Sequence, residues 1–281
     1  MITRFAPSPT GPLHLGHAFS AITAHDRARA AGGQFLLRIE DTDRARCRPQ
    51  YEAAIYDDLH WLGLSWHEPV LRQSDHLPAY ATVLQNLTDR SLTYPCQCSR
   101  ADIHAALSAP QEAVTHLPPD GAVYPGTCRT KALPPSAHHA IRLDLVKALD
   151  IFSKTLGGFT ETGSERAGYH PLNCETLRHT VGDVVLGRRD IGTVAYHLAV
   201  VVDDAGQGIT EVTRGMDLFD ATPIHVLLQQ LLGLPTPTYH HHRLIRDGAG
   251  KRLAKRDDAK SIAKFRTDGA TPGDIRRMVG L

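Results

Sequence analysis

The sequence contains no apolar run long enough to cross a membrane. The longest one near the middle, residues 198–202, has the length of a buried strand. No charged segment followed by an apolar one precedes the first motif, so we expect no signal peptide and a cytoplasmic location. With 281 residues of ordinary globular composition, the chain is long enough for one large domain with an insertion.

The sequence also lacks a large excess of either charge. Its 31 Lys and Arg residues stand against 30 Asp and Glu residues, and a net charge of +1 argues against extensive coating of a nucleic acid. The charges are unevenly spread, because residues 243–281 hold 11 basic and 5 acidic side chains. This basic segment could dock locally on a phosphate backbone or could be a solvated helix, and charge alone does not decide.

The most informative stretch lies near the start of the chain, at residues 4–17. A short apolar strand leads into a turn rich in proline and glycine, and a helical pattern then runs to residue 31. The first turn of such a helix offers free backbone N–H groups, and His14 and His17 lie beside it. The pattern indicates a phosphate-binding turn, and a purely capping or packing role of the two histidines is the alternative.

A second polar group follows the apolar strand expected over residues 34–39. Glu40 comes directly after this strand, at the edge where open α/β sheets bind ligands, and two further acids follow it closely. We expect Glu40 to point into a cleft, with a solvated turn as the alternative. The amphipathic helices expected over residues 49–63 and 77–92 show no chemical pattern and are assigned to the core.

Three of the five cysteines, Cys96, Cys98 and Cys128, lie within 33 residues. In a cytosolic chain such clustering points to a metal more than to a disulfide, and thiolates suit tetrahedral zinc. Three thiols leave the fourth position to another side chain, while three buried or spare thiols are the alternative. The candidates for the fourth ligand are Tyr124, His104, His116, His138 and His139.

The second half of the chain predicts strands over residues 183–186, 194–202 and 209–213, and a helix over residues 220–232 that starts with an Asp. Arg214 follows one of these strands, again at the ligand edge, where a surface salt bridge is the alternative role. Tyr196 falls inside the strand expected over residues 194–202, where core positions are more common than ligand contacts.

Two segments near the end carry residues that could do chemistry. In a strand, His240 and His242 would share one face and invite a metal, although no acid or thiol companion is nearby. Farther on, residues 251–256 form a concentrated basic loop. This loop is either a solvated charge run or a flexible clamp that closes on phosphates.

These separated stretches together resemble one family. Residues 7–17, Pro-Ser-Pro-Thr-Gly-Pro-Leu-His-Leu-Gly-His, are similar to the HIGH signature of class I aminoacyl-tRNA synthetases in its glutamyl and glutaminyl version. Residues 252–256, Arg-Leu-Ala-Lys-Arg, stand where the family has KMSKS. Residues 37–43, 183–204 and 213–218 match in the family's order. The chain therefore resembles the glutamyl-tRNA synthetase family, and most closely its short members.

The resemblance implies an α/β fold with the Rossmann-type parallel sheet of a class I synthetase catalytic domain. It also implies an inserted α+β subdomain that carries zinc, and a short C-terminal helical segment with a KMSKS-like loop. The two halves of the Rossmann domain would be residues 1–93 and 181–238, the insertion residues 94–180, and the C-terminal segment residues 239–281.

The resemblance also implies two sets of site residues. The ATP-binding set is Pro7, Gly11, His14, Gly16, His17, Arg252, Leu253, Ala254, Lys255 and Arg256, in which His14, His17 and Lys255 would be catalytic. The glutamate-binding set is Arg4, Phe5, Ala6, Pro7, Ser8, Glu40, Tyr196 and Arg214. In this set Arg4 and Arg214 suit a side-chain carboxylate and Glu40 suits the α-ammonium, which favours glutamate over glutamine. Arg252 and Ala254 depart from KMSKS, so the contribution of that loop is open.

The short members bind zinc through Cys-x-Cys, a Tyr and a final Cys, spaced Tyr-x-x-x-Cys. Cys96, Cys98, Tyr124 and Cys128 match this order, and four filled positions imply one structural Zn²⁺. The loop over residues 105–123 is longer than the resemblance leads us to expect, and its role stays open.

The implied reaction has two steps. The α-carboxylate of glutamate, already ionised at pH 7, attacks the α-phosphorus of ATP, aided by Mg²⁺, and glutamyl-adenylate then donates its glutamyl group. The chain ends 25 residues after Arg256, so we expect no anticodon-binding domain. Short members act on queuosine in the anticodon loop of tRNA(Asp), and we expect the same acceptor and a monomer here. The closest alternative is a truncated glutamyl-tRNA synthetase charging a tRNA 3′ end; a non-catalytic tRNA- or nucleotide-binding protein and a small-molecule ligase are more distant ones.

Overall fold

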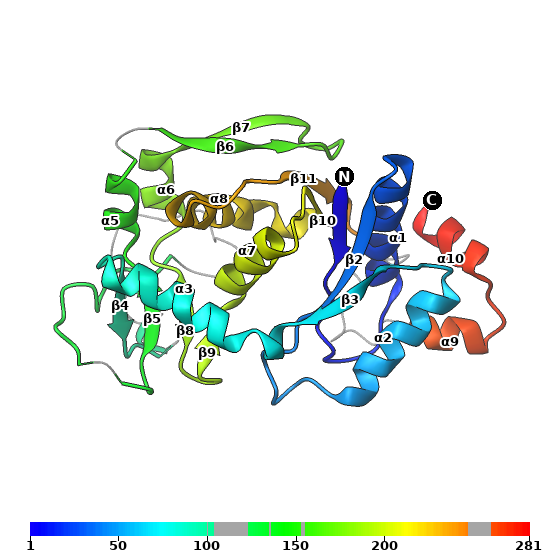
Figure 1. The fold of residues 1–281 in the computed structure, drawn as a ribbon, viewed down its shortest axis with the longest axis horizontal. Coiled ribbons are helices and arrows are strands. Elements are labelled where there is room, and N and C mark those ends of the chain that lie inside the picture. Colours follow the sequence, from blue (N-terminus) through cyan, green and yellow to red (C-terminus); the bar gives the residue numbers. More distant parts are fainter. Residues whose placement is uncertain (100, 104–122, 135, 153–154, 247–259) are drawn as a thin grey trace.

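The computed structural model describes residues 1–99, 101–103, 123–134, 136–152, 155–246 and 260–281 (Figure 1). Its strands are β1 (Ile2–Phe5), β2 (Gln34–Ile39), β3 (His67–Arg72), β4 (Thr93–Cys96), β5 (Ala140–Leu143), β6 (Thr155–Glu161), β7 (Gly168–Asn173), β8 (Val185–Arg188), β9 (Thr193–Val194), β10 (Glu211–Gly215) and β11 (Thr238–His242). Its helices are α1 (Leu15–Ala30), α2 (Pro49–Trp61), α3 (Leu77–Asp89), α5 (Leu145–Asp150), α6 (Cys174–Thr180), α7 (Tyr196–Gly206), α8 (Thr222–Leu232), α9 (Ile262–Thr267) and α10 (Pro272–Val279), with 3₁₀ turns η1 (Gln73–Asp75) and η2 (Met216–Ala221).

A parallel sheet of β1, β2 and β3 forms the first part of the molecule. Helix α1 connects β1 to β2, and both strands bury aliphatic and aromatic side chains in one apolar core with α1 and α2. The C-terminal helices return to this part, where α10 packs on α1 and Arg276 pairs with Asp26 at 2.6 Å (Figure 1). The expected strand, turn and helix at the start of the chain are therefore confirmed, as are the helices expected over residues 49–63 and 77–92.

The second sheet has the order β10, β11, β6, β7, in which β10 and β11 are parallel and β6 and β7 form an antiparallel pair. It meets the first sheet where β10 lies beside β1, because the Thr210 N–H donates to the Ile2 carbonyl at 2.9 Å. Helices α3, α7 and α8 contribute to a second apolar core beside it. The carboxyl ends of β1 and β10 thus come together between two cores, as in a parallel α/β fold.

The third sheet, β4, β5, β8 and β9, is antiparallel and carries the start of the cysteine-rich region. Two of its strands come from before residue 181 and two from after it. In Figure 1 it lies at the far end of the molecule from α1 and α10, with α3 running between the two ends.

Four expected elements differ from the structure. The strand expected over residues 194–202 is wrong, because these residues mostly form helix α7. A short apolar run fits a buried strand and a buried helix equally well, and here almost every side of the helix is covered. The strands expected over residues 183–186 and 209–213 are each shifted by two residues, to Val185–Arg188 and Glu211–Gly215. Helix α8 begins at Thr222, so its expected N-terminal Asp220 lies in η2 instead.

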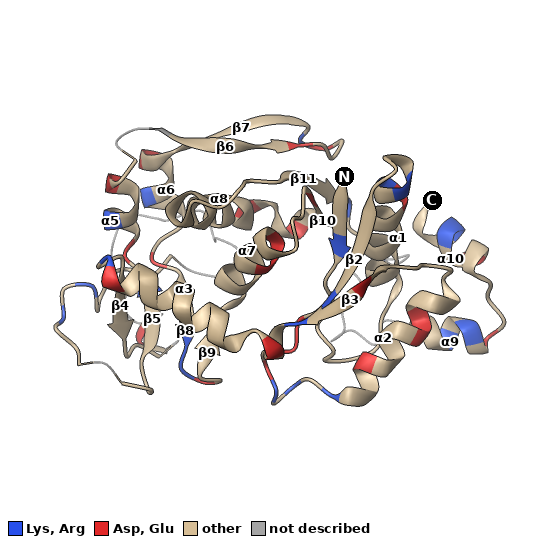
Figure 2. Cartoon of the chain, in the orientation of Figure 1, with Lys and Arg blue, Asp and Glu red and all other residues tan. Residues whose placement is uncertain are grey.

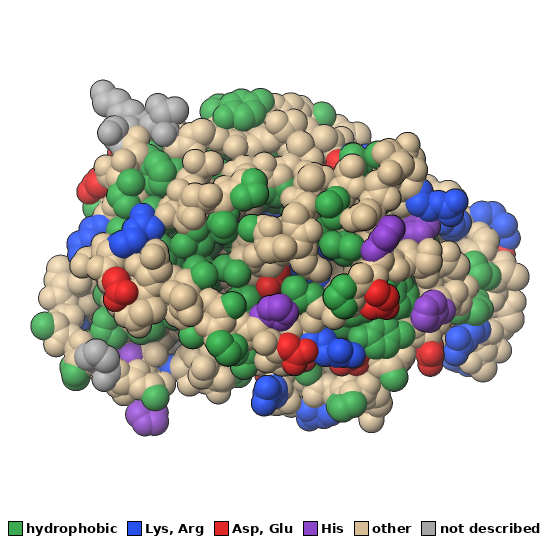
Figure 3. All heavy atoms as spheres, in the orientation of Figure 1, with side chains coloured by type: hydrophobic (Ala, Val, Ile, Leu, Met, Phe, Trp, Pro, Cys, Tyr) green, Lys and Arg blue, Asp and Glu red, His purple; other side chains and the backbone are tan. Residues whose placement is uncertain are grey.

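None of the helices described is both long and apolar enough to span a bilayer. On the face drawn in Figure 3, basic, acidic and histidine side chains are interspersed with hydrophobic ones, and no single basic patch covers that face. This distribution agrees with the small net charge of +1.

Candidate functional site

A cleft of about 540 Å³ opens where β1 and β10 end. One side is formed by the end of β1, the turn after it and the start of α1; the other is formed by β10, η2 and the first residue of α7. The lining residues are Arg4, Phe5, Ala6, Pro7, Ser8, Thr10, His14, Gly16, His17, Ser20, Glu40, Tyr196, Thr213, Arg214, Gly215, Asp217, Leu218, His242, Leu244 and Ile245. This set contains all eight residues expected to bind glutamate, together with His14, Gly16 and His17 of the ATP-binding set.

The rest of the expected ATP-binding set does not line the described cleft. Gly11 is buried in the turn and is not among the lining residues. Residues 252–256, including Lys255, lie outside the described residues. The described chain on both sides of them reaches the site, because Ile245 lines the cleft and the Ile262 N–H donates to the Leu13 carbonyl at 2.9 Å.

His14 and His17 cap helix α1 and line the cleft at the same time. His14 is the N-cap residue, and its Nδ1 accepts the Gly16 N–H at 3.1 Å. His17 Nδ1 accepts the His14 N–H at 3.2 Å, and the two ring centroids are 3.8 Å apart. In a neutral imidazole whose Nδ1 accepts, the proton sits on Nε2. The capping alternative is therefore compatible with phosphate binding, since both rings lie at a helix N-terminus.

Buried charged groups support the β1 side of the cleft. Arg4 donates to both oxygens of Asp204, from Nε at 2.9 Å and from Nη2 at 3.2 Å, and Arg38 donates to Asp204 from Nη1 at 2.7 Å. Arg38 also lies 3.7 Å from Asp203 and 3.3 Å from Glu40. Figure 2 shows these acidic positions of α7 beside basic positions of β1 and β2. Two guanidiniums and three carboxylates favour a cationic group at this end of the cleft.

Burial and the two arginines together set the protonation of these acids. Burial alone would raise the pKa of Asp204, but Arg4 and Arg38 outweigh it and hold the pKa below its usual value. For Glu40, burial outweighs the opposing effect of Arg38 and Arg4, so the pKa of this carboxyl is raised. Asp204 is therefore a firmly ionised partner of both arginines, whereas Glu40 is held less firmly in its charged form.

Arg214, on the β10 side, has different neighbours. Its Nε donates to His241 Nε2 at 3.0 Å and its Nη1 to His225 Nδ1 at 3.0 Å. Its Nη2 donates to Thr222 Oγ1 at 2.8 Å and to the Leu218 carbonyl at 3.2 Å. Across the described part of the chain, no carboxylate oxygen comes within 4 Å of this guanidinium, although Arg214 is only 6% exposed.

Tyr196 lies at the mouth of the cleft, with 38% of its surface exposed. The strand interpretation placed it more readily in the core, but as the first residue of α7 it projects from a helix end. It also lines a second cleft of about 910 Å³, whose other lining residues include Arg142, Arg188 and Arg189. The two clefts are therefore neighbours at Tyr196.

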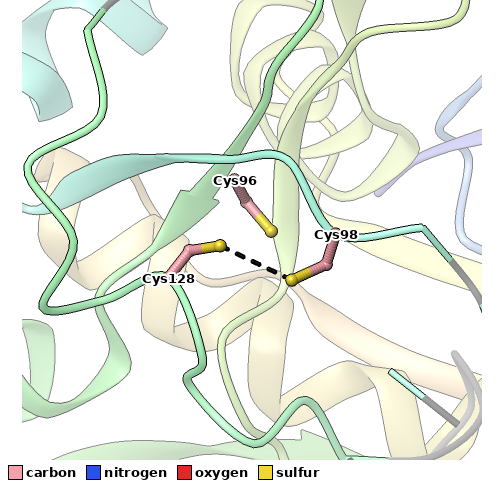
Figure 4. A group of neighbouring side chains, drawn as sticks. All are labelled: Cys96, Cys98 and Cys128. Atoms are coloured by element: carbon pink, nitrogen blue, oxygen red, sulfur yellow. Dashed lines mark hydrogen bonds between the residues drawn. The ribbon is translucent and has the colours of Figure 1, made fainter. Parts of the chain in front are cut away.

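The three clustered cysteines come together beside that second cleft. Their ligand atoms all lie within 4.8 Å of one another, and Figure 4 shows the three sulfurs pointing toward a common centre. Tyr124 Oη lies 3.3 Å from Cys96 Sγ and 3.4 Å from Cys98 Sγ. Burial alone would raise the pKa of the Cys128 thiol, but hydrogen bonds, first among them that with Tyr124, lower this pKa to about 7. Three thiols and a phenol oxygen at these distances can hold a metal ion.

The other candidate fourth ligands that the structure describes, His138 and His139, do not join this group. His104 and His116 lie outside the described residues, and His139 Nδ1 bonds instead to the Pro134 carbonyl. The thiol group is the one potential metal cluster of three or more His, Cys, Asp or Glu residues in the described ranges. His240 and His242 lie on β11 as expected, but they bond to Thr162 and Ser20 respectively.

Several residues of the site carry no signal in the sequence. His225 and His241 reach Arg214 from α8 and β11, and Glu161 reaches His241 from β6. They are far apart along the chain, and neither buried histidine belongs to a motif. The acids Asp203 and Asp204 had a local signal, since both follow an apolar run, but only the helical geometry of α7 directs Asp204 at Arg4.

Comparisons with known proteins show which family the chain belongs to. Residues 1–118 and 171–281 match the family described as tRNA synthetases class I (E and Q), catalytic domain. The chain is 61% identical to a glutamyl-Q tRNA(Asp) synthetase of Rhodobacter capsulatus over the full length of both proteins. It is 42% identical to the protein of that name in Deinococcus radiodurans, over 97% of this chain and 85% of the relative.

A solved structure of a glutamate tRNA ligase has a similar fold. The crystal structure of a glutamate tRNA ligase from Elizabethkingia meningosepticum, in complex with its amino acid, matches with a TM-score of 0.75 and 26% identity. The match covers all of this chain and 60% of the ligase chain, so the chain spans less than two thirds of that enzyme. On this evidence the chain belongs to the class I tRNA synthetases of the E and Q branch, and within them to the glutamyl-Q tRNA(Asp) synthetase family.

Proposed function

We propose that this protein activates L-glutamate with ATP, without tRNA, and transfers the glutamyl group to queuosine at the wobble position of tRNA(Asp). The observation that carries the proposal is the polarity of the cleft. Its β1 side offers Glu40 among an excess of carboxylates, and its β10 side offers the guanidinium of Arg214. Glutamate, with an ammonium at one end and a carboxylate at the other, matches this polarity. The names of the relatives support the same acceptor.

The activation step needs charge neutralisation and alignment more than a base. The α-carboxylate is ionised at pH 7; its oxygen forms a bond to the α-phosphorus while the bond to pyrophosphate breaks. The Nε2–H groups of His14 and His17 and the N-terminus of α1 can donate to phosphate oxygens. Lys255 is assigned to the same task from the sequence. Mg²⁺ bound with ATP would supply further positive charge to the phosphates.

The specificity for glutamate follows from Arg214 and Arg4. Arg4 has one N–H on each Nη beyond those that bond to Asp204 and Thr213, and Arg214 has a second N–H on Nη1. These donors suit a carboxylate. Glutamine would leave the buried guanidinium of Arg214 without a charged partner, at a cost of roughly 1–3 kcal/mol.

One assay tests this function and its closest alternative. Labelled glutamate and ATP are incubated with tRNA(Asp) that carries queuosine, with tRNA(Asp) that lacks it, and with tRNA(Glu). We expect label only on the queuosine-containing tRNA(Asp), and glutamate-dependent pyrophosphate exchange without any tRNA. Label at the 3′ end of tRNA(Glu), or no label at all, would overturn the proposal.

We further propose one structural Zn²⁺ held by Cys96, Cys98, Tyr124 and Cys128, a set that fits the ion because thiolates are its preferred ligands. The change Cys128→Ser should remove the metal and lower the melting temperature by about 5–10 °C. The matched control is Cys47→Ser, which alters a cysteine outside the cluster. Metal analysis and thermal melting read the result, and a full zinc content in the Cys128 variant would contradict the assignment.

A further inference from the structure

The buried side of Arg214 is built from neutral hydrogen-bond acceptors. An arginine side chain can only donate, so the two ring nitrogens that face it must both accept. This fixes His241 with an unprotonated Nε2 and His225 with an unprotonated Nδ1. The remaining acceptors, Thr222 Oγ1 and the Leu218 carbonyl, are uncharged as well.

Each imidazole is held in the required tautomer by a partner on its far side. His241 Nδ1 lies 2.5 Å from Glu161 Oε2, which accepts the Nδ1–H. Glu161 is itself fixed, because its Oε1 accepts the backbone N–H groups of His241 at 2.9 Å and of Gly163 at 2.6 Å. Glu161 is 2% exposed, and its carboxylate stays separated from Arg214 by the width of an imidazole ring.

The second imidazole has a histidine behind it. His225 Nε2 lies 3.0 Å from His197 Nδ1, so the Nε2–H of His225 donates a hydrogen bond to His197 Nδ1. Both rings are buried, and His197 also lines the second cleft beside Tyr196. Arg214, His197, Arg4 and His241 all disfavour a positive charge on His225, and the ring centroid of Tyr196 lies 5.7 Å from that of His225.

These surroundings keep both rings neutral. Burial, with Arg214 next, lowers the pKa of His225 well below its usual value. The same two causes lower the pKa of His241 to about 2. A protonated ring would lose the accepting nitrogen and would place a second positive charge against the guanidinium.

We infer that His225 and His241 are positioning residues that hold Arg214 through neutral acceptors, with Glu161 and His197 fixing their tautomers, so that the arginine keeps its charge for an anionic substrate group. A carboxylate in direct contact, such as Asp204 has with Arg4, would orient a guanidinium equally well but would compensate its charge. The inference rests on the proposed function in one respect, namely that the anionic group is the carboxylate of glutamate.

The first test needs neither a variant nor a substrate. Long-range ¹⁵N NMR of the histidine rings in the intact enzyme reports which nitrogen carries the proton. We expect His225 protonated only on Nε2 and His241 only on Nδ1, unchanged from about pH 8 to about pH 6. A proton on either nitrogen that faces Arg214 would overturn the inference, whatever the substrate is.

The second test separates charge from shape at one position. Asn and Asp both place an oxygen near the former Nδ1 of His225, but only Asp brings a negative charge to Arg214. We expect His225→Asn to keep the KM for glutamate within about threefold, and His225→Asp to raise it about tenfold or more with a smaller change in kcat. The preference for glutamate over glutamine should fall about tenfold in the Asp variant alone.

The matched control is Gln230→Asp, which adds the same charge to an exposed position of α8. Thermal melting of all variants shows that they fold. Equal KM values for the Asn and Asp variants of His225 would contradict the inference. A wild-type enzyme without glutamate-dependent exchange would instead overturn the proposed function, and the NMR result would then decide the hydrogen-bond arrangement by itself.

Discussion

The two arginines that enter the cleft from neighbouring strands are held in opposite ways. Arg4 on β1 shares Asp204 with Arg38, within a cluster of three carboxylates. Arg214 on β10 bonds to two imidazoles, a hydroxyl and a carbonyl. Both arginines are almost fully buried, so burial does not explain the difference. The charge of the immediate partners does, and it gives the cleft one anionic and one cationic side.

This contrast assigns different tasks to the two sides. Ion pairs on the β1 side hold two sheet strands and α7 together, because Arg4, Arg38 and Asp204 come from three different elements. The neutral partners of Arg214 contribute less to stability and leave more of its charge to the cleft. Removing a charge should therefore affect mainly folding on the first side and mainly substrate binding on the second.

The largest effect is expected from Asp204→Asn, which removes the carboxylate that Arg4 and Arg38 share on the β1 side of the cleft. The change leaves two buried guanidiniums without their shared carboxylate and should reduce the free energy of unfolding by about 3–5 kcal/mol. Urea unfolding measures it. The control Asp43→Asn removes a carboxylate that pairs with the exposed Arg46 and, at 3.8 Å, with the half-buried Arg188, and it should cost less than about 1 kcal/mol. A loss for Asp204→Asn as small as that of the control would remove the distinction between the two sides.

A smaller loss of stability is expected when the pH is lowered, and this loss should begin with the histidines that contact Arg214. His241 has a folded-state pKa of about 2, below the value near 6.5 in the unfolded chain, so the unfolded state binds more protons as the pH falls. Stability is therefore lost below about pH 6.5, by about 2 kcal/mol from this residue at pH 5. His225 acts in the same direction.

Asp204 on the carboxylate side responds later. The pKa of Asp204 is already lowered in the folded state, so its contribution is present above the unfolded value near 4 and is lost only as the pH falls farther. Urea unfolding between pH 7 and pH 5 tests whether stability is lost first through His241, before Asp204 is protonated. In His241→Gln the loss over this range should be smaller by about 2 kcal/mol. The same loss in wild type and variant would show that His241 is not held neutral.

Local patterns in the sequence predict only part of this contrast. The stretch from β1 to α1 combines a strand, a proline and glycine turn and a helix start, and each leaves its own local signal, so the first side of the cleft could be predicted. The clustering of Cys96, Cys98 and Cys128 likewise predicts a group that the fold brings together, while Tyr124 as its fourth member is implied by the family resemblance. All eight residues of the expected glutamate set line one cleft, although their roles remain predictions.

The surroundings of Arg214 could not be predicted in the same way. His225, His241 and Glu161 lie on α8, β11 and β6, and only tertiary packing brings them to one arginine. The apolar run before Asp203 gave the wrong element, because burial on all sides removes the periodicity that separates strand from helix. The sequence suggests His240 and His242 as a possible metal pair, whereas His241, the residue between them, contacts Arg214.

The smallest effect is expected from Glu40→Gln, which separates substrate binding from stability within the carboxylate side. Glu40 contacts Arg38 at 3.3 Å but keeps 11% of its side chain exposed to the cleft, so its loss should change the melting temperature little. The KM for glutamate should rise about tenfold, because the α-ammonium loses a charged partner. In the wild type the KM should also rise as the pH falls toward the raised pKa of Glu40, and this dependence should vanish in the variant. Glutamate-dependent pyrophosphate exchange measures the KM of the variant and the pH dependence of KM in the wild type. An unchanged KM in the variant would show that Glu40 pairs with Arg38 and does not bind the substrate.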